Sequence, residues 1–168
     1  MTLSIRPETS ADIPAIERLT ADAFLHAPHR SGTEQFIVDA LRRTGQLTLS
    51  LVALEDGELV GHVALSPVHI SSGATGWYGL GPISVMPARQ GAGIGSRLMV
   101  AALAGLRDLG AEGCVLLGDP GYYSRFGFVV HPGLVLPGVP AEYFQALSLG
   151  GNWAEGEVSY HAAFDATA

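Results

Sequence analysis

The stretch that decides the fold reads Gly81-Pro-Ile-Ser-Val-Met-Pro-Ala-Arg-Gln-Gly-Ala-Gly-Ile-Gly-Ser-Arg-Leu-Met99. It begins as a hydrophobic strand, passes through Gly91, Gly93 and Gly95, and continues with apolar residues at helical spacing. Glycines let the main chain approach a ligand closely, and a helix start offers free N–H groups and the positive end of its dipole. The order strand, glycine turn, helix therefore predicts a loop that binds a diphosphate. A flexible connection without a ligand is the alternative for the glycines alone.

The same order of elements also opens the dinucleotide-binding fold, in which Asp119, after the next strand, would bind a ribose. Ser96, however, stands where that fold has its third glycine. Two helices and antiparallel strands precede the loop, and no further strand–helix units follow Asp119. These departures disfavour a dinucleotide ligand.

Periodicity and turn residues place the other elements around this unit. Ser10 or Asp12 is expected to cap the first helix, and Asp56-Gly57 is typical of a tight turn between antiparallel strands. That first helix is expected around the apolar positions Ile13, Ile16, Leu19, Ala23 and Phe24. Further helices are expected from about 33 to 43, from about 94 to 109 and near 141–147, and strands from residue 4 and at 47–54, 58–70, 77–86, 113–117 and 157–164.

Length and composition limit the class of protein. A chain of 168 residues with 48% hydrophobic residues is expected to form a single domain over residues 1–168. All nine basic residues are arginines, which excludes a Schiff-base lysine and a phosphate-binding lysine. The net charge of −7 opposes binding to nucleic acid and to anionic membranes, so neither is expected as a partner.

Residues 59–88 contain no Asp, Glu, Lys or Arg, but they are too rich in glycine and proline for a membrane span. They are expected to form strands in the middle of a sheet that is covered on both faces. A single cysteine, Cys114, excludes a disulfide within the chain, and the first residues lack the pattern of a secretion signal. A cytoplasmic protein is therefore expected.

Further segments extend the pattern beyond the glycine loop. They are Leu-Gly-Pro-Ile-Ser-Val at 80–85, Leu-Gly-Asp-Pro-Gly-Tyr-Tyr-Ser-Arg-Phe-Gly-Phe at 117–128, Pro-Ala-Glu-Tyr-Phe at 140–144 and Gly-Glu-Val-Ser-Tyr-His-Ala-Ala-Phe at 156–164. With Gln90-Gly-Ala-Gly-Ile-Gly95 they resemble the GNAT-type N-acetyltransferases, specifically a bacterial branch of predicted acetyltransferases. The resemblance covers nearly the whole chain.

This resemblance implies an α/β fold, a mixed central β-sheet with splayed strands flanked by helices. It also implies acetyl-CoA as co-substrate, with the pantetheine arm paired to main-chain groups of Ile83 and Val85 in the gap between the splayed strands. N–H groups of the loop would hold the diphosphate, and these belong to Gln90, Gly91, Ala92, Gly93, Ile94, Gly95 and Ser96.

Acyl transfer to an amine passes through a tetrahedral intermediate and requires a proton for the departing thiolate. A phenol is protonated at neutral pH and suits this task. By the resemblance the catalytic residue is Tyr123, and Tyr122 is expected to pack beside it. On the residues alone, both tyrosines could be ordinary core aromatics.

The base that removes the amine proton is less determined. Many relatives carry a glutamate on the strand before the loop, whereas residues 59–88 have no carboxylate. His62 and His69 are the side-chain candidates there, and water or an amine that arrives neutral is the alternative. The remaining histidines lack a metal-ligand spacing, so no metal is expected. They are His26, His29, His131 and His161.

The acceptor is expected to bind between the segments 26–32 and 131–140. Arg30 and Arg125 could contact an acidic group on it, and Trp77 and Trp153 could line its pocket or pack in the core. Cys114 lies in an apolar strand and argues little for an acyl-cysteine intermediate.

Together these observations predict an acetyl-CoA-dependent N-acetyltransferase that acetylates a primary amine, on a small molecule or a peptide, by direct attack in a ternary complex. The alternative is a non-catalytic acyl-CoA-binding regulatory module. The acceptor's identity, the use of longer acyl-CoAs and the oligomeric state, a homodimer included, stay open.

Overall fold

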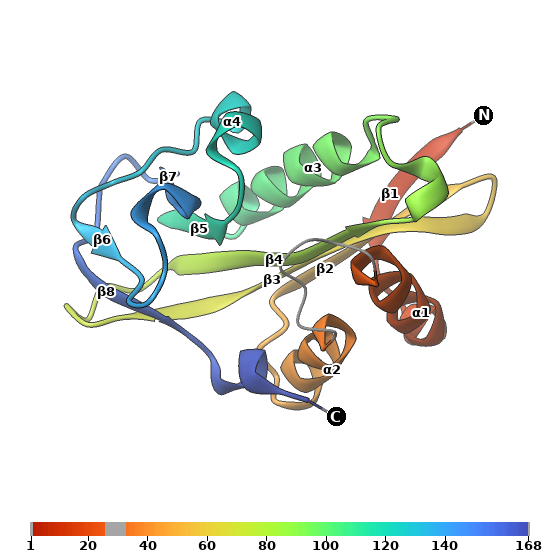
Figure 1. Cartoon of the computed structure of the whole chain (residues 1–168), viewed down its shortest axis with the longest axis horizontal. Coiled ribbons are helices and arrows are strands. Elements are labelled where there is room, and N and C mark those ends of the chain that lie inside the picture. Colours follow the sequence, from red (N-terminus) through yellow and green to blue (C-terminus); the bar gives the residue numbers. More distant parts are fainter. Residues whose placement is uncertain (1, 26–32, 168) are drawn as a thin grey trace.

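The computed structural model describes residues 2–25 and 33–167, which form a mixed sheet flanked by helices (Figure 1). Its main path has the strand order β1-β2-β3-β4-β5-β7, and β8 pairs with both β3 and β6. The strands are β1 Leu3–Pro7, β2 Leu49–Glu55, β3 Glu58–Ile70, β4 Trp77–Val85, β5 Gly113–Leu117, β6 Leu134–Val135, β7 Phe144–Ser148 and β8 Gly156–Tyr160. The α-helices are α1 Ile13–Phe24, α2 Glu34–Arg43, α3 Ile94–Asp108 and α4 Pro120–Tyr123.

Helices cover the two faces of this sheet (Figure 1). Successive side chains of a strand point to opposite faces, and β2 shows this clearly. Ala53 belongs to the large core cluster that includes Leu98 of α3, whereas Val52 packs with Ile16 of α1 and Val38 of α2. The sheet thus has an α3 face and an α1–α2 face, each with its own hydrophobic core.

The uncharged stretch lies where the sequence predicts it. It supplies most of β3 and all of β4, which lie between β2 and β5 in the sheet. The turn before it has φ values of 51° at Asp56 and 84° at Gly57, as a tight hairpin turn requires. Within the described ranges, no helix is long and apolar enough to cross a bilayer.

Two expectations in the last third of the chain are wrong. The helix expected near 141–147 is a short 3₁₀ turn, Ala141–Tyr143, followed by β7. Burial on both faces is the reason, because Phe144 and Ala146 belong to the core cluster around Trp77, Leu147 packs against the large core cluster, and β7 pairs with every residue of β5. The last strand also ends at Tyr160, and a 3₁₀ turn follows.

The start of α1 differs in detail from the expected cap. Asp12 occupies the N-cap position of α1, but its side chain makes no capping hydrogen bond to that helix. Its carboxylate instead accepts hydrogen bonds from the backbone N–H of Thr9 at 2.7 Å and from Arg6 at 2.7 and 3.1 Å. Asp12 therefore fixes the connection between β1 and α1.

Candidate active site

A gap opens along one edge of β4. This strand pairs with β5 only at Trp77, Tyr78 and Gly79, whereas β5 pairs over its whole length with β7 on its other side. Figure 1 shows β5 beside the first part of β4 only. A register shift falls at the same place, because two steps along β3, from Val63 to Leu65, match three steps along β4. Such a bulge bends the strand, so β4 leaves β5 after Gly79.

The second half of β4 directs main-chain groups into this gap. The N–H of Met86 donates to the carbonyl of Val60 on β3 at 2.8 Å. Because main-chain groups alternate sides along a strand, Ser84 also faces β3, while Ile83 and Val85 face the open edge. The Val85 carbonyl there accepts a hydrogen bond from Nε2 of Gln90 at 3.2 Å. These are the two residues that the sequence predicts to pair with a pantetheine arm.

The glycine loop continues directly from this edge. Gly91 and Gly93 have φ values of 83° and 84°, in the left-handed region that side chains rarely adopt. A Cβ on either glycine would meet no protein atom within 4 Å, so the space beside both is open. Gly93 is the N-cap of α3, and no side chain caps the helix there. The first N–H groups of α3 are thus available to an anion.

A cavity of about 370 Å³ lies over the loop. Arg89, Tyr122 and Arg125 join the predicted residues around it, and the Arg125 guanidinium carbon lies 4.6 Å from the centre of the Tyr122 ring. Neither Ile83 nor Ala92 is among its lining residues. The predicted cofactor-binding residues that do line it are Val85, Gln90, Gly91, Gly93, Ile94, Gly95 and Ser96. Main-chain N–H groups and two arginines suit an anionic ligand such as a diphosphate.

The two adjacent tyrosines differ in their surroundings. The Tyr122 hydroxyl lies 3.1 Å from Oγ of Ser96, so this residue contacts the loop as well as packing, which corrects the expectation that it only packs. Tyr123 packs against the large core cluster, and its ring leaves no room for a Cβ on Gly118 at the end of β5. Its hydroxyl makes no hydrogen bond to any described residue.

Tyr123 remains protonated over a wide pH range. Burial raises the pKa of its phenol, and the neighbouring Tyr122 and the Asp119 carboxylate raise it further. Asp119 itself caps α4, where its side chain accepts a hydrogen bond from the N–H of Gly121 at 2.8 Å. This capping role differs from the ribose contact of a dinucleotide fold. A protonated phenol beside the end of β5 can act as a proton donor.

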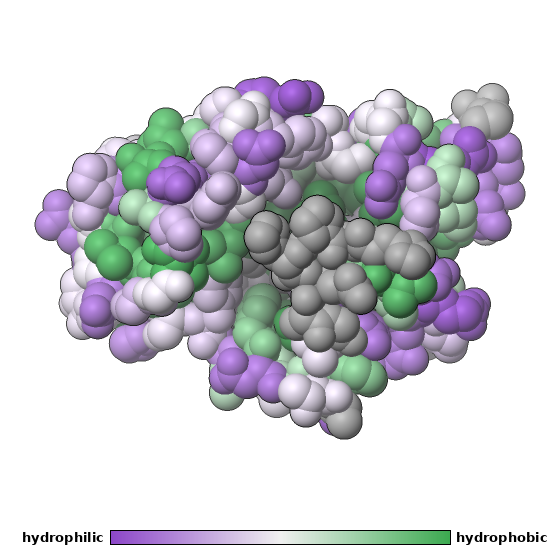
Figure 2. Space-filling view, in the orientation of Figure 1, coloured by the Kyte–Doolittle hydropathy of each residue, from purple (hydrophilic) through white to green (hydrophobic). Residues whose placement is uncertain are grey.

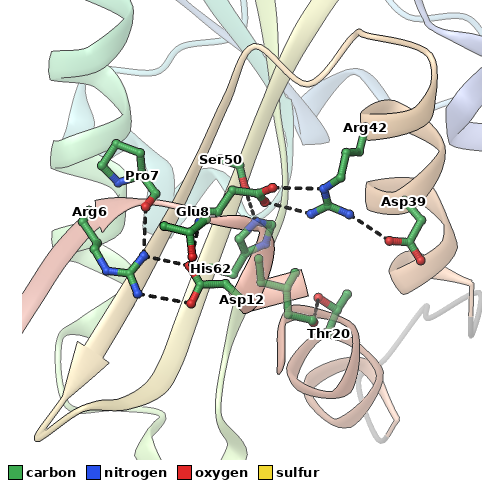
Figure 3. A network of polar contacts seen from close by, with 11 residues as sticks. Arg6, Pro7, Glu8, Asp12, Thr20, Asp39, Arg42, Ser50 and His62 are labelled. Carbon is green, nitrogen blue, oxygen red and sulfur yellow. Dashed lines mark hydrogen bonds and ion pairs between the residues drawn. The ribbon is translucent and has the colours of Figure 1, made fainter. Parts of the chain in front are cut away.

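The two histidine candidates on β3 occupy opposite environments. His69 is exposed and lies opposite Ser159 of β8. His62 is fully buried, its Nε2 lies 2.7 Å from Oγ of Ser50, and burial lowers its pKa to about 4. Ser50 also contacts Glu8, which is bound by Arg42 (Figure 3). Only His62 therefore belongs to an internal polar network.

Sequence reasoning missed the partners of His62. Glu8 and Ser50 precede it by 54 and 12 positions, so no local spacing indicates that they meet. It also missed Arg89, which lines the loop cavity and forms an ion pair with Glu55. The one signal in the sequence that directs attention to His62 is an absence, because residues 59–88 contain no carboxylate.

The predicted acceptor region is partly described. The segment 26–32, with His26, His29 and Arg30, lies outside the described residues. Leu136 and Pro137 of the other segment line a cavity of about 570 Å³ together with Tyr160. Figure 2 shows hydrophobic surface around β6 in this region. The Tyr160 ring lies against Gly79, so this cavity adjoins the place where β4 and β5 separate.

Other candidates have structural contacts. Trp77 is buried, and its ring centre lies 6.0 Å from that of Trp153. Trp153 stacks on His131 at 4.2 Å, and Nδ1 of His161 accepts a hydrogen bond from the N–H of Ala163 at 3.0 Å. Among the residues that the structure describes, no three His, Cys, Asp or Glu side chains gather as a metal site would require.

Splayed parallel strands, a bulged strand and a glycine loop at a helix start define an acyl-CoA N-acyltransferase fold. The family described as "Acetyltransferase (GNAT) domain" matches residues 4–130, so the chain belongs to the GNAT acetyltransferases. Curated relatives include the uncharacterized N-acetyltransferase YhbS of Escherichia coli K12, 40% identical over 125 residues, which are 74% of this chain and 72% of YhbS.

Solved structures give the same assignment. A GNAT family acetyltransferase from Brucella melitensis in complex with acetyl-CoA is 51% identical, with a TM-score of 0.87 over 98% of this chain and 99% of that one. The Escherichia coli YhbS structure in complex with CoA is 36% identical, with a TM-score of 0.88 over 99% and 93% of the two chains. The expected family and fold are confirmed.

Proposed function

We propose that the protein transfers the acetyl group of acetyl-CoA to a primary amine by direct attack in a ternary complex. The observation that carries this proposal is the open edge of β4, which runs without interruption into the glycine loop. An acyl-CoA has an amide-containing arm, which suits the open strand edge, and a diphosphate, which suits the glycine loop. The similar Brucella and Escherichia coli structures, solved with acetyl-CoA and with CoA, support the match.

The residues around the gap have separate tasks in this proposal. Main-chain groups of Ile83 and Val85 bind the pantetheine amides as an added strand would. Gln90 must release the Val85 carbonyl for that pairing, which frees its own amide for the ligand. The N–H groups of residues 90–96 bind the diphosphate, and Arg125 and Arg89 add positive charge beside it.

Tyr123 is proposed to protonate the departing thiolate. Its ring is fixed against Gly118, and its raised pKa keeps the phenol protonated at neutral pH. Cys114 does not suit an acyl-cysteine route, because it is fully buried and burial raises its pKa far above the usual range. The acetyl group therefore passes directly to the amine, whose approach is expected from the cavity beside Tyr160.

Binding and turnover test this proposal separately. At one hundred times Kd, acetyl-CoA stabilises the native state by about 2.7 kcal/mol, which raises Tm by roughly 5–10 °C for a domain of this size. NADH and ATP serve as controls and are expected to leave Tm unchanged. A shift with NADH but none with acetyl-CoA would refute the proposed ligand.

A screen of primary amines with acetyl-CoA, read by the release of free thiol, then tests the reaction. We expect release to depend on at least one small amine or peptide amine. Acetyl-CoA binding without release across the whole panel would instead favour the non-catalytic acyl-CoA-binding module.

A further inference from the structure

A chain of polar side chains crosses the α1–α2 face of the sheet (Figure 3). Arg42 of α2 donates to the Glu8 carboxylate through Nε at 3.0 Å and through its terminal nitrogen at 2.8 Å. Glu8 contacts the Ser50 hydroxyl, and Ser50 Oγ lies 2.7 Å from Nε2 of His62. The chain runs from a half-buried arginine at the surface to a histidine with no exposure at all.

The ionisation of Glu8 fixes the protons along this chain. Burial alone would raise the pKa of Glu8, but hydrogen bonds from Arg42 and Ser50 outweigh burial and lower it. An ionised carboxylate only accepts hydrogen bonds, so the Ser50 hydroxyl donates to Glu8. Ser50 then has no proton left for His62, and Nε2–H of His62 must donate to Ser50. His62 is therefore held as the tautomer with its proton on Nε2 and a lone pair on Nδ1.

The lone pair on Nδ1 is the inner end of the chain. Nδ1 of His62 is buried and has no hydrogen-bond partner among the described residues. Oγ of Ser84, the residue opposite His62 on β4, is likewise buried without a partner. Buried polar atoms in proteins almost always have a partner, a protein group or a water molecule. These two atoms therefore form a small polar site that can bind a donor such as water.

This polar site lies one strand away from the gap. Ser84 stands between Ile83 and Val85, whose main-chain groups face the open edge of β4. Adjacent strands are about 4.8 Å apart. The gap is therefore two strand spacings, about 10 Å, from β3, and bridging water at Nδ1 of His62 is the connection between the imidazole and an amine that approaches the acyl group.

Burial and the charged groups on the neighbouring elements together determine the pKa of His62. Glu8, after β1, favours the imidazolium, and Arg42 of α2 opposes it. Asp39 of α2 pairs with Arg42, and Glu17 of α1 contacts Asp39. Burial outweighs all of them and lowers the His62 pKa to about 4. The imidazole is thus unprotonated at Nδ1 throughout the neutral range.

We propose that Nδ1 of His62 accepts the proton of the attacking amine through bridging water, while Ser50 and Glu8 position the imidazole. This role rests on the proposed acetyl transfer. As the amine nitrogen bonds to the acyl carbon and the carbon–sulfur bond breaks, the amine proton passes to the water and the water gives a proton to Nδ1. The thiolate takes its proton from Tyr123. The Glu8 carboxylate stabilises the positive charge of the imidazolium from the far side of Ser50. After the products depart, the extra proton leaves Nδ1 through the bridging water to solvent, and the Tyr123 phenolate takes one proton from solvent, so that both groups are restored.

The first test needs no turnover. Nitrogen-15 NMR of imidazole-labelled protein is expected to show His62 as the Nε2–H tautomer at pH 7, with a pKa of about 4. In Ser50→Ala this fixed tautomer is expected to give way to a mixture. A His62 that is the Nδ1–H tautomer, or whose pKa is the ordinary value of about 6.5, would overturn the proposal.

The second test compares rates. A glutamine at position 62 can still donate to Ser50 but offers no base at the position of Nδ1. For His62→Gln we expect kcat to fall about 10²-fold and to rise with pH, as solvent hydroxide replaces the base. The acetyl-CoA Kd is expected to stay unchanged, and Ser66→Ala, at another buried polar residue of the same strand, is the matched control.

A purely structural role of His62 predicts a different pattern. The variant would then lose stability and keep the pH profile of the wild type, and that result would overturn the proposal. Failure of the proposed function is distinguishable, because the wild type itself would then release no thiol with any amine.

Discussion

The open edge of β4 and the side-chain network on the α1–α2 face beside it are built in opposite ways. On the open side, residues 83–96 follow one another in the chain and contribute mainly main-chain groups. On the α1–α2 side, Glu8, Arg42, Ser50 and His62 come from four separate segments and contribute only side chains. A binding surface made of consecutive main chain tolerates many sequences. A buried side-chain network depends on each member, so single substitutions are expected to act differently on the two sides.

The largest expected effect concerns the buried side. His62 has a pKa of about 4 in the folded protein, against about 6.5 in the unfolded chain. Between pH 6.5 and 4 the His62 imidazole takes up a proton in the unfolded chain but not in the folded protein. The free energy of unfolding therefore has its full value above pH 6.5 and declines as the pH falls to 4. The decline amounts to about 3 kcal/mol, and urea unfolding at pH 7.0, 5.5 and 4.5 measures it.

Two variants sharpen this comparison. His62→Gln removes the group that titrates, so most of the decline between pH 6.5 and 4 is expected to vanish. His69→Gln, at an exposed position of the same strand, is expected to keep it. An unchanged decline in His62→Gln would show that another group causes the acid lability.

The next effect concerns the proton donor at the gap. Tyr123→Phe keeps the ring against Gly118, so the acetyl-CoA Kd is expected to change little. We expect kcat to fall about 10²-fold, the lower end for general acid catalysis, because a thiolate is a tolerable leaving group. Any decline of rate at high pH that follows phenol ionisation should disappear as well. Steady-state rates from pH 6 to 10 measure both.

Tyr122→Phe is the matched control for this tyrosine. It removes the hydroxyl next to Ser96 and is expected to retain most of kcat. Equal rates for Tyr123→Phe and the wild type would exclude Tyr123 as the acid. A loss confined to Tyr122→Phe would assign the acid to Tyr122 instead.

The smallest expected effect concerns the open side. Gly93 has a φ of 84°, and the left-handed conformation costs a residue with a Cβ about 1–2 kcal/mol. In Gly93→Val the surface loop can relax without ligand and must recover this conformation on binding. We expect the acetyl-CoA Kd to rise about 5–30-fold, with cooperative unfolding retained. Isothermal titration and urea unfolding measure the two quantities.

A second glycine provides the control. Gly138 has the same φ of 84° and open space around its Cβ position, but it does not line the loop cavity. Gly138→Val is expected to leave acetyl-CoA binding unchanged. Normal binding by Gly93→Val would place the diphosphate elsewhere.

The fold was predictable where the signal is local. The turn at Asp56-Gly57, the start of α3 after Gly93 and the limits of β5 follow from neighbouring residues, and the structure has them as expected. The expected helix at 141–147 is wrong because its short apolar pattern fits more than one period. The segment forms strand β7 and not a helix, because its main chain pairs with the otherwise free edge of β5.

The candidate site divides along the same line. The sequence by itself determined the glycine loop at the start of α3 and the adjacent pair of tyrosines, because a glycine turn before a helix and an aromatic motif are contiguous signals. Only the tertiary structure decided that Tyr122 reaches Ser96 and that Glu8 and Ser50 meet His62. The physical reason is that sheet register and helix packing bring together side chains that are far apart in the sequence. The burial and the charges that result determine which groups of the His62 network are protonated, and no spacing in the sequence indicates them.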